Sequence, residues 1–344
     1  KMSKSLGNVV DPMVIIEGRK NQKQEPAYGA DVLRLWVSSV DYSADVPIGA
    51  GILRQLSDVY RKVRNTSRYL LGNLHDFVPS RDEIAISDLP LLDRWMLQRT
   101  ATVLDQISEA FEAYEFFRFF QLLQNFCVAD LSNFYLDIAK DRLYVSAPND
   151  KRRRSCQTVM ALIIERLAAA IAPVLCHMAE DIWQNIPYPT GTESVFLSGW
   201  PSVPEEWRDD SLQAPMRELR ELRAAVNKVL EECRSKRKLG ASLEAAVRIE
   251  ARTPALKDAL HWLQSKGDQE VDGLRDWLIV SQLQIGGEPW AELLASDDNE
   301  LAVIEVALSR GEKCERCWHY ESDIGQHSDH PSLCGRCVSV LERR

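Results

Sequence analysis

The chain has 344 residues, of which 45% are hydrophobic and 27% charged, a profile typical of a globular protein with two or three domains. Its net charge of −9 argues against unspecific binding to polyanions. The sequence contains no apolar run of membrane-spanning length and no signal-peptide pattern, so we expect a cytoplasmic protein without a membrane partner. Because residue 1 is Lys and not Met, we expect a piece of a longer protein.

The first eight residues place two lysines among small hydroxyl residues, in the run Lys1-Met2-Ser3-Lys4-Ser5-Leu6-Gly7-Asn8. Gly7 and Asn8 tolerate positive φ, so the backbone can turn tightly there. Ammonium groups, hydroxyls and free backbone N–H groups on a short loop suit a polyphosphate. A solvated, Lys-rich tail is the alternative interpretation.

A polar loop over residues 18–26 precedes a short helix over residues 28–37. The helical period predicts that Val32, Leu33, Trp36 and Val37 form its buried face, with Asp31 favourably near its start.

Residues 50–186 have a strongly helical pattern. Four amphipathic helices are expected, at 52–74, 91–111, 116–138 and 150–186, and Pro173 should break the last one. Long helices with short polar connections predict an antiparallel bundle. The aromatic residues Phe116, Phe117, Phe119, Phe120 and Phe126 are expected in its core rather than at a functional site. The single cysteines lie in helical, apolar patterns along the chain and are expected to be buried small hydrophobes: Cys127, Cys156, Cys176 and Cys233.

A proline-rich stretch at 187–210 marks a domain boundary, after which the pattern changes. A helix over 211–238 should end at a basic cluster and Gly240. The strands and the helix that follow predict a small α+β module; the strands are 245–251, 279–285 and 301–308, and the helix is 254–264.

Two basic clusters stand out on this acidic chain, Lys151–Arg154 and Arg234–Lys238. Each is either a solvated helix end or a place where RNA phosphates are bound.

The strongest chemical signal is the pair Cys314-x2-Cys317 and Cys334-x2-Cys337, with sixteen residues between the two turns. This spacing is typical of a four-thiolate zinc site, and it favours a reducing compartment; disulfides or a redox pair are the alternatives. Gly335 allows a tight conformation in the second turn. Four cysteines complete a closed structural site, so three nearby histidines are not expected to be ligands: His319, His327 and His330.

Trp318 follows the first cysteine turn, with arginines around it at positions 316, 336, 343 and 344. The ring either packs on the zinc turn or stacks on an RNA base. The segment after residue 310 is too short to bury a core unaided, so the metal should supply much of its folding energy.

These motifs resemble those of a known protein family. The run at residues 1–5 resembles, letter for letter, the KMSKS signature of class I aminoacyl-tRNA synthetases, and Gly29–Trp36 resembles the segment that follows it in branched-chain enzymes. Further short segments resemble the sequences of isoleucyl- and valyl-tRNA synthetases: Arg64–Thr66, Phe134–Asp137 and Arg153–Thr158 in the helical region, and the junction Lys238–Ala245. The cysteine tail resembles that of the bacterial isoleucyl-tRNA synthetases, whereas valyl enzymes usually end in a coiled coil. The polar loop at 18–26 looks like an insertion.

The resemblance implies a mainly α fold: an antiparallel helix bundle of the anticodon-binding type, then a small α+β module and a C-terminal four-cysteine zinc module. The implied domains are the KMSKS loop with the end of the catalytic core at 1–48, the bundle at 49–200, the junction module at 201–310 and the zinc module at 311–344.

The resemblance also implies a set of site residues. Lys1 and Lys4 would be catalytic, and ATP with magnesium would lie on Lys1, Met2, Ser3, Lys4 and Ser5. Zinc would bind Cys314, Cys317, Cys334 and Cys337. The residues expected to contact RNA are Arg153, Arg154, Lys236, Arg237, Arg316 and Trp318.

The implied activity is ligation of isoleucine to tRNA(Ile) with ATP, by a monomer. We expect this chain alone to be inactive, because the amino-acid pocket is not visible in its sequence. The alternatives are a stand-alone, non-catalytic RNA-binding zinc module and a fragment of a valyl-type enzyme.

Overall fold

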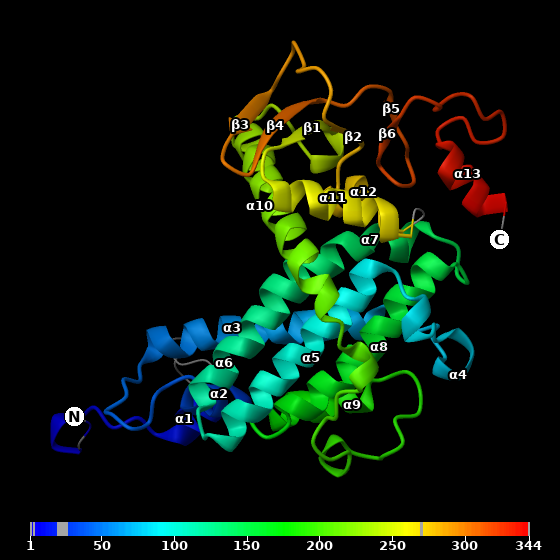
Figure 1. Cartoon of the computed structure of the whole chain (residues 1–344). Helices are drawn as coiled ribbons and strands as arrows, with labels where there is room; N and C mark the ends of the chain where they lie inside the picture. Colours follow the sequence, from blue (N-terminus) through cyan, green and yellow to red (C-terminus); the bar gives the residue numbers. More distant parts are fainter. Residues whose placement is uncertain (1, 3, 19–26, 269–270, 343–344) are drawn as a thin grey trace. The chain divides into compact units, whose positions relative to one another are not determined.

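The computed structural model describes residues 2, 4–18, 27–268 and 271–342 (Figure 1). Its α-helices are α1 Pro12–Glu17, α2 Ala30–Ser38, α3 Ala50–Gly72, α4 Pro79–Asp82, α5 Leu91–Glu112, α6 Phe116–Asn125, α7 Leu136–Val145, α8 Lys151–Ile171, α9 Cys176–Gln184, α10 Gln213–Ser235, α11 Pro254–Lys266, α12 Leu274–Leu278 and α13 Gly335–Glu342. The strands are β1 Ala245–Ala251, β2 Gln282–Ile285, β3 Ala295–Asp298, β4 Ala302–Leu308, β5 Glu312–Lys313 and β6 Tyr320–Glu321. Long helices, a small sheet and a C-terminal cysteine cluster confirm the predicted fold class.

The chain divides into two compact units, each assembled from separate segments. The first consists of residues 1–81, 99–135 and 157–205, and the second of residues 82–98, 136–156 and 206–344. Among the described residues, no helix is both long and apolar enough to cross a membrane.

The first unit is helical, and α3 is its longest helix. One face of α3 is buried, including Leu53, Val63 and Leu70, and it packs against α2, α9 and residues 126–135. The buried face predicted for the helix at 28–37 was wrong in part. Leu35 is buried there and Val37 is 51% exposed, because the buried face of α2 contains Val32, Leu35 and Ser38.

The helix predicted at 116–138 is longer and less regular than expected. Between α6 and α7, residues Phe126–Tyr135 form a π-helical stretch, so that helical structure continues to Val145. The Thr66 hydroxyl of α3 lies against this stretch, 2.8 Å from Ser132 Oγ and 3.4 Å from the Cys127 carbonyl oxygen. Extra residues in a helical turn of this kind are rare and leave no periodic signature in the sequence.

The core prediction for the aromatic residues holds for Phe119 and Phe126, which are buried, whereas Phe117 is exposed. The predicted break at Pro173 is confirmed, since α8 ends at Ile171 and α9 begins at Cys176.

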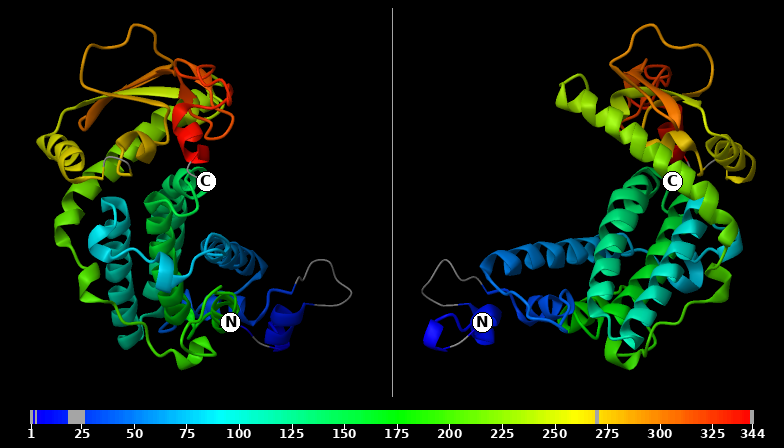
Figure 2. Two further views of the ribbon diagram at one scale, coloured as in Figure 1. Left: turned by 90° about the vertical axis from the view of Figure 1, so that its right-hand side faces the viewer. Right: turned by 60° about the vertical axis from the view of Figure 1, so that its left-hand side comes forward.

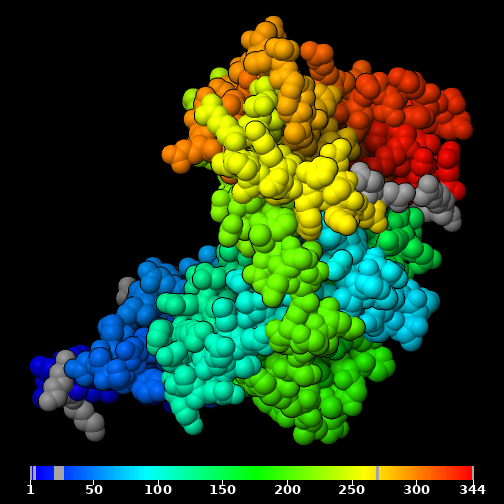
Figure 3. All heavy atoms as spheres, viewed as in Figure 1, coloured from blue at the N-terminus to red at the C-terminus, as the bar shows by residue number. Residues whose placement is uncertain are grey.

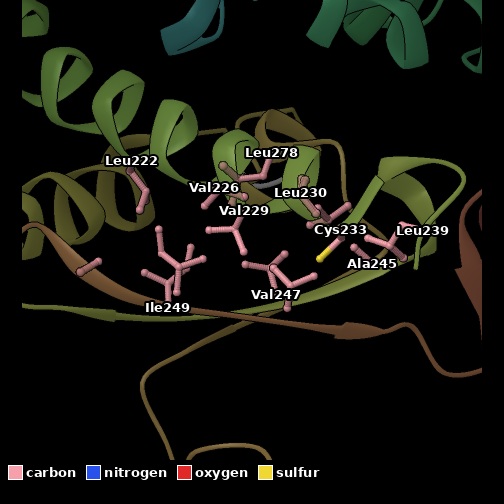
Figure 4. Close-up of a cluster of buried hydrophobic side chains, with 14 of the residues drawn as sticks. Leu222, Val226, Val229, Leu230, Cys233, Leu239, Ala245, Val247, Ile249 and Leu278 are labelled. Atoms are coloured by element: carbon pink, nitrogen blue, oxygen red, sulfur yellow. The ribbon is translucent and has the colours of Figure 1, made fainter. Parts of the chain in front are cut away.

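The second unit contains a four-stranded sheet with the order β2-β1-β4-β3. Strands β1 and β2 are parallel, and the other two pairings are antiparallel. Helix α10 lies along one face of this sheet (Figure 2). Figure 4 shows side chains of α10, such as Val226 and Val229, pointing toward Val247 and Ile249 of β1, and all four are buried. The alternation predicted for 245–251 therefore sets which face of β1 meets the helix.

Among the elements of this unit that the sequence did not predict are α12 and β3. Residues 274–278 form α12, and Ile279, at the start of the strand predicted for 279–285, is a left-handed residue that ends this helix, with φ 55°. The short β3 pairs with β4. The end of α10 also differs from the expectation: Arg237, with φ 56°, is the left-handed residue, and Gly240 is not. The Lys238 N–H donates to the Cys233 carbonyl across this turn.

Candidate zinc centre and nucleic-acid interface

The lysine loop lies only partly within the described residues. Lys1 and Ser3 are outside them, and Lys4–Leu6 form one 3-10 turn. Gly7 has φ 64°, which fits the predicted tight turn. Met2 and Ser5 are exposed, and the Val10 N–H lies 3.5 Å from Met2 Sδ.

Helix α2 is hydrogen-bonded to the turn between α8 and α9. Two residues of the Gly29–Trp36 segment form these hydrogen bonds. Arg34 donates from Nε to the Val174 carbonyl (2.9 Å) and from Nη2 to the Pro173 carbonyl (2.6 Å). Asp31 accepts from the Met178 N–H at 2.8 Å, so its carboxylate caps α9. The segment thus fastens α2, which follows the lysine loop in sequence, to the helices of the first unit.

The four clustered cysteines converge in the second unit. All four are buried, and their sulfur atoms lie within 4.8 Å of one another. The first pair lies between the short strands β5 and β6, and the second pair lies at the start of α13. The tail forms a compact group of orange-red and red spheres in Figure 3. None of these cysteines is in a disulfide, which excludes that alternative for this structure.

Backbone contacts shape both cysteine turns. The Cys314 N–H donates to the His319 carbonyl (2.8 Å), and the Cys334 N–H points to Cys314 Sγ (3.4 Å). Gly335 allows a close contact with the side chain of Asp323. A Cβ at this position would lie 2.9 Å from Asp323 Oδ2, which accepts the Gly335 N–H at 2.7 Å.

The pKa values of the cysteine thiols depend on their contacts with one another. Hydrogen bonding from its neighbours, first from Cys334, lowers the pKa of Cys317, and the same contact raises the pKa of Cys334 to about 11. The Cys317 thiolate is therefore stabilised by hydrogen bonds from neighbouring groups, and a zinc ion would favour the thiolate form of its cysteine ligands. The terminal nitrogens of Arg316 are buried beside these cysteines. An anionic zinc–tetrathiolate centre would balance that charge, so the residues present fit zinc.

The nearby histidines are not part of the cluster. The described residues that could hold an ion here are the four cysteines alone. His319 is buried, and desolvation lowers the pKa of its imidazole. His327 Nε2 lies 3.3 Å from Asp323 Oδ2.

Arg336 anchors the module to α7. It binds both carboxylate oxygens of Asp141, at 2.7 and 2.8 Å, and Val145 of α7 packs against the cysteines. Burial raises the pKa of Asp141, but the hydrogen bonds and charge of Arg336 outweigh this effect and the pKa is lowered. Asp141 is therefore held as a carboxylate.

The residues expected to contact RNA fall into two groups. Trp318 is 61% exposed and has φ 67°, and Lys313 Nζ lies 5.4 Å from the centre of its ring. Lys236 and Arg237 are also exposed. These three side chains are accessible to a nucleic acid, and Trp318 does not pack into the cysteine core.

The guanidinium groups of the other residues predicted to contact RNA are directed toward protein atoms. Arg153 is buried and donates to the Leu143 and Pro148 carbonyls. Arg154 is buried beside Asn149 and Asp82. We therefore correct the expectation for these two arginines: their guanidinium groups satisfy protein acceptors and are not available to phosphates. The terminal nitrogens of Arg316 are likewise turned inward.

Comparisons with known proteins match this arrangement segment by segment. Residues 1–49 match the family described as tRNA synthetases class I (I, L, M and V), and residues 93–249 match the anticodon-binding domain of tRNA ligase. Residues 311–340 match the zinc finger found in FPG and IleRS.

Three similar relatives are all named isoleucine–tRNA ligase. The whole chain is 95% identical to the one from a Synechococcus species, 78% to that of Parasynechococcus marenigrum and 76% to that of Prochlorococcus marinus. It covers 36%, 35% and 36% of their lengths, about a third of each. The chain therefore belongs to the isoleucine–tRNA ligase family of class I tRNA synthetases.

Proposed function

We propose that the protein joins isoleucine to tRNA(Ile) in an ATP-dependent reaction, and that this chain supplies the phosphate-binding loop, the tRNA-binding helices and a structural zinc module. The observation that carries the proposal is the 95% identity along the entire chain to an isoleucine–tRNA ligase. The reaction first forms isoleucyl-adenylate and pyrophosphate from isoleucine and ATP. The isoleucyl group then passes to the terminal ribose of the tRNA.

In the first step, the loop at residues 1–5 closes on ATP. The ammonium groups of Lys1 and Lys4 stabilise negative charge on the phosphates as pyrophosphate leaves, and they transfer no proton. Magnesium accompanies ATP, because Mg²⁺ favours phosphate oxygens. Backbone N–H groups and hydroxyls of Ser3 and Ser5 complete the phosphate contacts.

For the tRNA side, we propose contacts by Trp318, Lys236 and Arg237, which are the exposed members of the predicted set. The ring stacks on a base, and the two cations bind phosphates. Four cysteines fill the coordination of the zinc ion, so its role is structural. Reduced thiolates fit a cytoplasmic location, and we propose that the protein acts as a monomer.

The test is Lys4→Ala in the complete ligase. Loss of this charge should lower isoleucine-dependent ATP–pyrophosphate exchange by roughly 10²- to 10³-fold, whereas tRNA affinity stays unchanged. Lys228→Ala, which removes an exposed lysine of α10, serves as the matched control. Unchanged exchange in Lys4→Ala, or exchange by this chain alone, would contradict the proposal.

A further inference from the structure

A second cluster of metal-ligand side chains lies in the first unit, where α2 meets the start of α9. Asp31 of α2 and the consecutive residues Cys176 and His177 of α9 each direct one donor atom to the same place. The sequence pattern predicted Cys176 to be a buried small hydrophobe, but its side chain is only half-buried. This cluster is separate from the four cysteines of the tail, which belong to the second unit.

The three donor atoms are spaced like the ligands of one ion. Cys176 Sγ lies 3.5 Å from His177 Nδ1 and 3.6 Å from Asp31 Oδ1, and His177 Nδ1 lies 3.0 Å from Asp31 Oδ1. A tetrahedral zinc ion with bonds of about 2.0–2.3 Å needs ligand atoms about 3.3–3.6 Å apart. Two of the three separations already have this value, and the third has to open by roughly 0.3 Å.

The surrounding structure holds the carboxylate in place. Asp31 is buried and accepts the His177 and Met178 N–H groups at 3.3 and 2.8 Å. Arg34, one turn further along α2, fixes the carbonyls of residues 173 and 174. Capping of α9 alone explains the position of the Asp31 carboxylate. It does not explain why the Cys176 thiol and the His177 imidazole both lie close to Asp31 Oδ1.

The site is open to solvent on one side. The His177 side chain is 74% exposed, whereas that of Asp31 is 5% exposed. An ion bound to the three donors therefore has an entry path and a fourth position that water can fill. Thiolate, imidazole and carboxylate are together the ligands that zinc accepts, and three protein ligands with one open position form a common zinc arrangement.

We propose that Asp31, Cys176 and His177 bind one zinc ion, with water as the fourth ligand. Binding releases the Cys176 thiol proton to solvent, and the His177 proton lies on Nε2 while Nδ1 coordinates the ion. The ion replaces the contact between His177 Nδ1 and Asp31 Oδ1 and ties α2 to α9 through bonds to both helices. This inference does not depend on the proposed ligase activity, because its test measures metal binding alone.

The test is cobalt titration of the full chain with zinc already in the four-cysteine site. Cobalt reports thiolate coordination by an intense sulfur-to-metal absorption band, and zinc should then displace it because zinc binds such sites more tightly. The expected result is one cobalt ion taken up per chain without release of the resident zinc.

The variants Cys176→Ser and His177→Gln leave the Asp31 cap in place and should fold, which helical circular dichroism checks. Cys176→Ser should abolish the band, and His177→Gln should weaken cobalt binding by at least roughly tenfold. His75→Gln, at another exposed histidine, is the matched control and should bind as the wild type does. Absence of the band in the wild type, its persistence in Cys176→Ser, or zinc release equal to cobalt uptake would each overturn the proposal.

Discussion

Trp318 shows how a single backbone angle decides what a side chain can do. Its N–H donates to the Cys314 carbonyl, which closes the first cysteine turn, and its φ of 67° is rare for a residue with a large side chain. The ring is left exposed with the Lys313 ammonium over it. A turn that shapes the zinc site therefore also presents an aromatic surface.

Replacing Trp318 by Ala should weaken tRNA(Ile) binding by about 1–3 kcal/mol, because one base loses its stacking partner. Zinc content should stay unchanged, since the ring is outside the cysteine core. Filter binding and metal analysis of the complete ligase measure the two effects. Phe196→Ala removes another exposed aromatic ring, outside the zinc module, and should leave tRNA affinity as it is. Wild-type affinity in Trp318→Ala would assign the ring no part in RNA binding.

The arginines illustrate the opposite case at the same scale. Arg153 and Arg237 both belong to basic clusters, but the first is buried against carbonyls of residues 143 and 148 and the second is exposed. The acceptors of Arg153 come from parts of the chain that carry no sequence signal for the pairing. A charge pattern alone therefore cannot separate a phosphate ligand from a structural guanidinium group.

At the scale of elements, the start of α5 depends on a residue from a distant part of the chain. Asp272 accepts the Leu91 N–H (2.9 Å), the Leu92 N–H (3.2 Å) and the Asp268 N–H (3.0 Å). The first two are N–H groups that a helix start leaves without intrahelical partners. Burial raises the pKa of Asp272, and the three donors offset this effect only in part.

Asp272→Ala should lower the free energy of unfolding by about 0.5–2 kcal/mol, since α5 loses its cap. The pH dependence follows from the raised pKa. With the folded pKa above the unfolded value of 3.8, the carboxyl group stabilises the fold most when protonated, and this contribution is lost as pH rises through the folded pKa.

Urea unfolding between pH 7 and pH 4 measures both effects. The wild type should gain stability relative to Asp272→Asn as pH falls, because only the wild type has the carboxyl group. A difference between these two proteins that does not change with pH would contradict the raised pKa.

At the scale of the whole molecule, the zinc module (residues 311 onward) and the four-stranded sheet with its packing helix α10 (the sheet module) are stabilised by different interactions. The sheet module has a buried apolar core between α10 and β1, β2 and β4 (Figure 4). The buried cluster of the zinc module consists of the four cysteines together with Val145 of α7, and Ile324 and Leu333 pack against it. So small an apolar core cannot offset the conformational entropy of ordering the segment, and the metal has to supply the difference.

Cys334→Ser should therefore release zinc and unfold the segment from 311 onward, while most helical circular dichroism is retained. Chelation of zinc from the wild type should give the same spectrum. Cys233→Ser, at a buried cysteine of α10, is a matched control that should keep the metal. Zinc retained in Cys334→Ser would mean that the ligand set is a different one.

Local signals in the sequence determined much of this protein. Apolar periodicity predicted most of the long helices and β1, Pro173 predicted the break after α8, and the spacing of the four cysteines predicted their convergence. Each of these signals acts within a few turns or within one metal site, so one stretch of chain carries the information.

Only the tertiary structure decided the rest: that Leu35 and not Val37 is buried, that Arg153 faces carbonyls, that Asp272 caps α5, and that Asp31 meets Cys176 and His177. In each case the deciding partner comes from another element of the chain. Burial and hydrogen bonding are properties of the packed neighbours, and no local pattern contains them.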